Sequence, residues 1–104
     1  MPTATLAGHA VSVDTEGFMT NPQEWTPEIA AEIAASVGLT LTDRHWKVVE
    51  FCRRDAADKG EPPGLRRIAQ GAEIPIKELY QLFPKGPAKV AAKIAGIPKP
   101  RGCI

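Results

Sequence analysis

Cysteine is scarce in this chain: only Cys52 and Cys103 occur among 104 residues. Two cysteines are too few for a disulfide framework and lack the paired spacing of a zinc site. We therefore predict free thiols in a reducing compartment, with no metal or cofactor. Long apolar runs are also missing, so no segment is expected to span a bilayer. Residues 1–6 lack the basic and apolar regions of a secretory signal. These absences predict a cytoplasmic protein with no membrane partner.

Acidic residues are absent from Leu79 to the end, although the whole chain has 12 of them against 13 lysines and arginines. The same segment contains five cations, namely Lys85, Lys89, Lys93, Lys99 and Arg101. A basic C-terminal third indicates a docking surface for an anionic or thiolate-bearing partner, or for nucleic acid. From charge alone, a solvated cationic face that serves only solubility is the alternative.

One α+β domain is the expected fold over residues 1–104. The chain has 43% apolar and 24% charged residues, near the average of globular proteins, and its ten prolines and nine glycines predict short elements. We expect a small β-meander, a helical body and a mobile C-terminal arm, at residues 1–20, 21–96 and 97–104. The arm follows from Pro98 and Pro100, which forbid regular helix and favour an extended chain.

Five helices are predicted for the body from their start and stop signals. The first runs from the Thr26-Pro27 pair to Gly38, and the second from Thr42 to Gly60. Three shorter helices follow, at 64–70, 76–83 and 88–95. The turn between the first two of these contains Gly71, so they are expected to form a helix-turn-helix.

Cys103 is the strongest functional signal in the sequence. It lies on a segment broken by proline and glycine that cannot bury it, and the nearby cations Lys99 and Arg101 favour the thiolate. This setting predicts a nucleophile or persulfide carrier, and the alternative is a cysteine without a role. Cys52 lies on the apolar part of the second helix and is expected to be buried. If it were exposed, it could instead act as a resolving thiol for Cys103.

The remaining polar residues give weaker signals. His9 is expected in a turn and His45 in the exposed first turn of a helix, neither as a ligand. Arg66 and Arg67, with the helix-turn-helix and the lysines of the fifth helix, form the case for a nucleic-acid contact. The fourth helix argues against it, because its apolar stripe suits core packing better than base readout.

Two C-terminal stretches carry a family resemblance, Leu79–Lys89 and Lys93–Pro100, followed by Gly102-Cys103-Ile104. The N-terminal half agrees at the turn Asp14–Phe18, at Trp25, at the helix start His45–Val49 and at the Pro63-x-x-Arg66 spacing. On these residues the chain resembles the TusE/DsrC family over nearly its whole length. The resemblance implies a β-meander packed on a five-helix, winged-helix-like body with a flexible C-terminal arm.

The resemblance also implies that Cys103 is a persulfide carrier, so that the chain is a sulfurtransferase-type relay protein rather than an enzyme with classical turnover. In the TusE branch, a TusBCD-type complex donates sulfur that moves toward an MnmA-type enzyme, which thiolates wobble uridine of tRNA. In the DsrC branch, DsrEFH-type complexes are donors and siroheme sulfite reductase exchanges the sulfur. The alternatives are a non-catalytic subunit associated with sulfite reductase and a DNA-binding regulator.

Two departures from the family pattern bear on this choice. Ala92 stands eleven residues before Cys103, where the DsrC branch has a second arm cysteine. An internal disulfide within the arm is therefore excluded, which favours a TusE-like single-thiol carrier. The segment 67–79 is shorter than is usual in the family, so we expect the contact surface for partners to be changed there.

Overall fold

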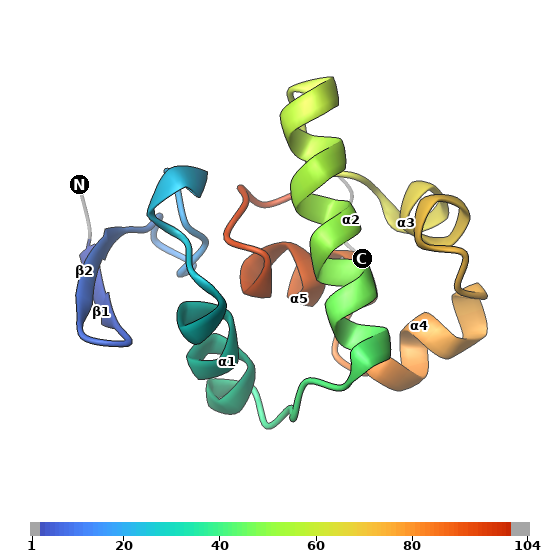
Figure 1. The fold of residues 1–104 in the computed structure, drawn as a ribbon, viewed down its shortest axis with the longest axis horizontal. Coiled ribbons are helices and arrows are strands. Elements are labelled where there is room, and N and C mark those ends of the chain that lie inside the picture. The colour runs from blue at the N-terminus through green and yellow to red at the C-terminus, as the bar shows by residue number, and fades with distance from the viewer. Residues whose placement is uncertain (1–2, 101–104) are drawn as a thin grey trace.

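The computed structural model describes residues 3–100, which form a two-stranded hairpin and five α-helices (Figure 1). The α+β class and all five expected helices are confirmed. The elements are β1 Thr3–Leu6, β2 His9–Ser12, the 3-10 helix η1 Pro22–Glu24, α1 Pro27–Ser36, α2 Asp43–Lys59, α3 Leu65–Ala72, α4 Ile76–Leu82 and α5 Pro87–Ile94.

The hairpin β1–β2 is antiparallel and turns at Ala7 and Gly8, whose φ angles of 50° and 80° suit a tight two-residue loop. The third strand of the expected meander is reduced to a single bridge between Val13 and Met19. The cause is the intervening turn, where Asp14 Oδ1 accepts two following backbone N–H groups at 2.8 and 2.9 Å. These bonds keep the chain in a turn instead of an extended strand.

Helix α5 lies at the centre of the core, between α1 and α2 in Figure 1, and it contacts all four other α-helices. Its first residue, Pro87, has the fixed φ that suits a helix start. Six of its eight residues are buried, namely Pro87, Ala88, Val90, Ala91, Ala92 and Ile94. Small alanines on this helix let α1 and α2 approach closely, so any surface formed by α5 is held by the whole core.

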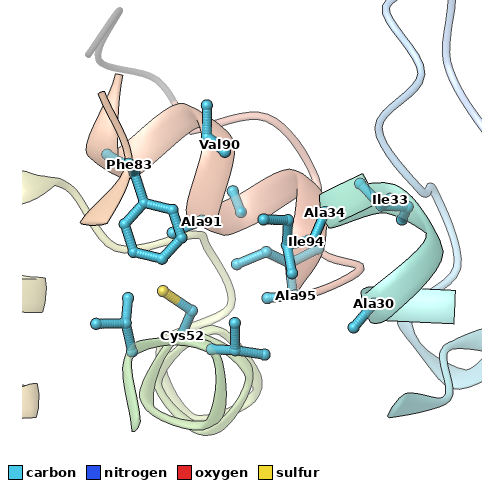
Figure 2. Packing of buried hydrophobic residues seen from close by; sticks show 14 of the residues in the cluster. Ala30, Ile33, Ala34, Cys52, Phe83, Val90, Ala91, Ile94 and Ala95 are labelled. Carbon is cyan, nitrogen blue, oxygen red and sulfur yellow. The ribbon is translucent and has the colours of Figure 1, made fainter. Parts of the chain in front are cut away.

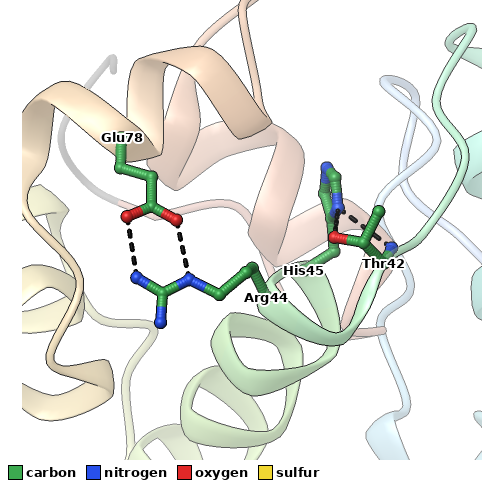
Figure 3. A network of polar contacts seen from close by, with 4 residues as sticks. All are labelled: Thr42, Arg44, His45 and Glu78. Atoms are coloured by element: carbon green, nitrogen blue, oxygen red, sulfur yellow. Dashed lines mark hydrogen bonds and ion pairs between the residues drawn. The ribbon is translucent and has the colours of Figure 1, made fainter.

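The first turn of α2 is joined to α4 by two polar side chains (Figure 3). His45 is only 6% exposed, so its expected exposure was wrong. Its Nδ1 accepts the backbone N–H of Thr42 at 3.1 Å, and Nε2 therefore carries the proton and donates to the carbonyl of Leu82 at 2.9 Å. Beside it, Arg44 donates two 2.7 Å hydrogen bonds to the carboxylate of Glu78. Together these contacts hold α4 against α2.

The sequence predicted that Gly71 lies in the turn between α3 and α4. In the structure it lies inside α3, so this prediction was wrong. The residue that ends α3 in a left-handed conformation is Glu73, with φ 58°. A Cβ on Gly71 would lie 2.0 Å from Cε1 of Phe51 in α2. The glycine is therefore needed for the close approach of two helices, which no local pattern reveals.

Candidate functional site

Cys103 and its neighbour Arg101 lie outside the described residues 3–100. The structure describes the segment that leads toward them, residues 95–100, here called the arm root. Its contacts set the place on the body from which the chain continues to Cys103. The candidate site is therefore built from the arm root and from the surface beside it.

Gly96 turns the chain sharply as it leaves α5. Its φ of 70° is left-handed, its N–H donates to the carbonyl of Lys93, and the next N–H, of Ile97, donates to that of Ala92, both at 3.2 Å. This is the Schellman ending of a helix, in which the residue after the glycine packs on the body. Ile97 is accordingly 1% exposed. Residues 97–100 are not helical, as predicted; the mobility expected of the arm stays a prediction, but its first residue is packed.

Two side chains from distant elements clamp the end of α5. Trp25 Nε1 donates to the carbonyl of Ile94 at 2.8 Å, and Arg53 donates to the carbonyls of Ala95 at 2.9 Å and Pro22 at 3.1 Å. The guanidinium of Arg53 also lies 4.1 Å from the centroid of the Trp25 ring. Burial lowers the pKa of Arg53, yet a guanidinium remains charged at neutral pH. A cation thus sits where the helix dipole is negative.

Neither clamp residue was assigned to the site from the sequence. In the sequence, Trp25 was only one of the residues that support the family resemblance, and in the structure its ring is partly buried. Arg53 has no local signal that separates it from the exposed Arg54 next to it. Its partner carbonyl, on Ala95 just after α5, is 42 positions away, so the pairing depends on how α2 and α5 pack.

Lys85, Lys89 and Lys93 line one open hollow of ≈ 370 Å³, here called the lysine hollow; the other lining residues are Glu16, Phe18, Val37 and Val90. The four-residue spacing of Lys89 and Lys93 puts both on one face of α5, and Lys85 reaches the same hollow from the turn before the helix. Lys93 Nζ also lies 5.8 Å from the centroid of the Phe18 ring. The structure thus brings three of the predicted docking residues together.

Lys99 connects the arm root to the same hollow. Its Nζ lies 3.0 Å from Oε1 and 2.8 Å from Oε2 of Glu16, which projects from the turn held by Asp14. The pair is exposed and adds little to stability. Its effect is positional, because it places the start of the arm beside the lysines. Of the predicted basic docking residues, only Arg101 lies outside the described range.

The two arginines predicted to contact nucleic acid differ in their surroundings. Arg66 is exposed on α3. Arg67 instead donates its Nε–H to Asp55 Oδ2 at 2.7 Å, and Asp55 is only 9% exposed. A guanidinium already held by a buried carboxylate is poorly available to a phosphate. The nucleic-acid contact stays a prediction, with Arg66 as its better-presented member.

Cys52 is fully buried, as expected, and its sulfur faces Phe83 and Ala91 (Figure 2). Burial, with a smaller effect of Asp55, raises the pKa of this thiol to about 12. At neutral pH it is therefore protonated and a poor nucleophile. The alternative role of Cys52 as a resolving thiol required exposure, and the structure does not provide it.

Residues 3–100 offer neither a metal site nor a membrane span. This part of the chain has no cluster of three or more His, Cys, Asp or Glu residues that could hold a metal ion. No helix within it is both long and apolar enough to cross a membrane. A second open depression, of ≈ 450 Å³, lies at the arm root and is lined in part by Arg53, Ile97 and Pro98.

The chain is similar in sequence to known proteins over nearly its whole length. A family profile described as DsrC like protein matches residues 5–104. A protein named Sulfurtransferase TusE from Salmonella typhimurium is 39% identical over 104 residues, covering 93% of this chain and 95% of the relative. The protein of the same name from Escherichia coli K12 is 38% identical, with the same shares covered.

Solved structures agree with the sequence comparisons. The NMR structure of Allochromatium vinosum DsrC superposes with a TM-score of 0.84 at 35% identity, over 98% of this chain and 97% of that one. The oxidized gamma-subunit of the dissimilatory sulfite reductase (DsrC) from Archaeoglobus fulgidus also gives 0.84, at 32% identity, over 99% and 100% of the two chains. Fold and sequence therefore indicate the same family.

Proposed function

Because this chain belongs to the DsrC-like protein family, we propose that it is a sulfur-relay protein whose working group is the Cys103 thiol. Its relatives include proteins named Sulfurtransferase TusE, which supports the role in sulfur transfer. The main observation that supports this proposal is that one of the two thiols, Cys52, is buried and hard to ionise. Cys52 is enclosed by the core with a pKa of about 12, so the relay depends on Cys103.

The proposed chemistry is a transfer between sulfur atoms. The Cys103 thiolate attacks the terminal sulfur of a donor persulfide, a new S–S bond forms on Cys103, and the S–S bond of the donor breaks. The donor leaves as a thiolate, and the proton of its persulfide stays on the transferred sulfur, so atoms and electrons balance. The persulfide on Cys103 is then attacked in the same way by the thiolate of an acceptor.

The partners in this proposal are a TusBCD-type or DsrEFH-type donor and an acceptor such as an MnmA-type tRNA thiolase or siroheme sulfite reductase. Ala92, where the two-cysteine branch has its second arm thiol, is buried in α5. With no second arm thiol, sulfur on Cys103 has to leave to another protein, which supports the TusE-like branch. Genes for tRNA thiolation beside this gene would agree with that branch, and sulfite reductase genes would contradict it.

Sulfur loading by a small donor tests which of the two thiols carries the persulfide. Incubation of the full chain with glutathione persulfide at pH 7.5 should add about 32 Da, the mass of one sulfur atom, to Cys103. Intact-mass measurement and peptide mapping locate the added sulfur. Cys52→Ala is the matched control and should load like the wild type, because Cys52 takes no part.

The Cys103→Ala variant should gain no sulfur. Loading of Cys52 in that variant, or a wild-type chain that stays unmodified, would remove the assignment to Cys103. Both readouts use a small donor, so they do not depend on which protein partner the chain has.

A further inference from the structure

An apolar recess adjoins the lysine hollow. It has a volume of ≈ 190 Å³ and is lined by Val37, Gly38, Leu39, Phe83, Pro84, Lys85 and Val90. Val37, Lys85 and Val90 line both depressions. The two depressions share these walls and lie next to each other along α5, one apolar and one cationic, and together they are here called the α5 groove.

The cationic end of the groove has unneutralised charge. Among residues 3–100, none of Lys85, Lys89 and Lys93 forms an ion pair with a carboxylate. Glu16 is the acidic residue in the lining, and it pairs with Lys99. A rise of 1.5 Å per helical residue puts Lys89 and Lys93, both in α5, about 6 Å apart along the helix axis. Carboxylates one helical turn apart on a partner would match this spacing.

The apolar end of the α5 groove favours an acidic protein segment over a nucleic acid as the bound anion. A nucleic-acid backbone satisfies lysines but has no aliphatic group to fill a recess walled by Val37, Phe83 and Val90. An acidic protein segment offers both, since one large apolar side chain can fill the recess while neighbouring carboxylates meet the lysines. Such an anchor in a pocket with a charged rim is the usual arrangement of a protein interface.

We propose that the α5 groove is the docking site of the sulfur-exchanging partner protein, which binds through an acidic segment with one large apolar anchor residue. This inference rests on the proposed function. Lys99 is held at the edge of the groove by Glu16, and the four residues from there to Cys103 reach at most about 14 Å. Cys103 is thus tethered within about 14 Å of the groove edge, a distance at which it can meet a thiol of a partner seated in the groove.

The experiment measures binding of a purified TusBCD-type donor complex to the labelled full chain by fluorescence anisotropy. Lys85→Glu/Lys89→Glu should weaken binding at least about tenfold, because two attractive contacts become repulsive. Leu39→Gln, which makes the partly buried recess wall polar, should weaken it about fivefold or more. The matched control Lys59→Glu/Lys77→Glu makes the same charge change at exposed positions of α2 and α4 and should bind nearly as the wild type does.

Several results would overturn the docking proposal. These are a wild-type chain that does not bind the donor, a control that loses as much affinity as the groove variant, and Leu39→Gln binding unchanged. Tighter binding of a tRNA with the same lysine dependence would assign the lysines to nucleic acid instead. Loading of each variant by glutathione persulfide is measured in parallel. Normal loading with unaltered donor binding would reject the groove while leaving the relay function standing.

Discussion

At the scale of single residues, the chemical difference between the two cysteines comes from packing. Cys52 lies on the face of α2 that also presents Val48 and Val49, and all three are 0% exposed. A thiolate there would lose its hydration and would face the nearby charge of Asp55, so the thiol form is strongly favoured. The core thus makes Cys52 inert without any special motif.

A dependence of stability on pH follows from this raised pKa. The pKa of Cys52 is about 12 in the folded chain against an ordinary 9.0, so below pH 9 both states are protonated and stability is unaffected. Between pH 9 and 12 the unfolded state loses this proton and the folded state keeps it. The free energy of unfolding should therefore fall with a slope of up to about 1.4 kcal/mol per pH unit.

Urea titrations of the wild type and of Cys52→Ala across this pH range test the effect. The other alkaline groups are common to both chains, so the difference between the two profiles isolates Cys52. Parallel profiles would mean that the buried thiol ionises as easily as a free one.

At the scale of elements, the end of α5 is fixed by contacts with distant segments as well as by its own helix cap. Gly96 combines a left-handed φ of 70° with close packing, because an added Cβ would lie 2.4 Å from Cδ1 of Trp25. The same ring donates to the Ile94 carbonyl and lies under Arg53. The direction of the arm root is thus linked to η1 and α2.

Gly96→Ala should therefore cost more stability than backbone strain alone. Gly38→Ala is the matched control, since Gly38 has φ 78° but no atom within 4 Å of an added Cβ. We expect a loss of about 1 kcal/mol for the control and about 2–4 kcal/mol for Gly96→Ala, which adds displacement of the indole. Urea denaturation measures both, and equal losses would show that Trp25 yields without cost.

At the scale of the whole molecule, α5 joins the N-terminal and C-terminal parts of the chain into one core. It contacts α1 on one side and α2, α3 and α4 on the others. One tryptophan lies in each of two parts of the chain: Trp25 in the part formed by the hairpin and α1, and Trp46 in the part formed by the remaining helices. A shared core predicts that both parts unfold together.

Ile94→Ala tests this cooperativity, because Ile94 is 0% exposed in α5. The substitution should lower the free energy of unfolding by about 2–5 kcal/mol through lost burial and a residual cavity. Tryptophan fluorescence and far-ultraviolet circular dichroism should still give one coincident transition. Separate transitions would mean that the hairpin with α1 unfolds independently of the remaining helices.

Local chemistry accounts for most elements and for the lysine face. The Thr26-Pro27 start of α1, the left-handed Gly60 after α2 and the turn at Asp14 depend on neighbouring residues, and each was found where the sequence indicated. Lys89 and Lys93 share a face of α5 because their spacing matches a helical turn, and Lys85 lies in the turn directly before that helix. Propensity, capping and periodicity act over a few positions, so the chain alone contains this information.

Contacts between distant segments decided the features that the sequence could not reveal. The burial of His45 requires the Leu82 carbonyl, the place of Gly71 within α3 requires the ring of Phe51, and Lys99 meets Glu16 across 83 positions. Arg53 differs from Arg54 only through the end of α5 that it reaches. Each of these depends on how the helices pack around α5, and packing is a property of the whole core that no short segment specifies.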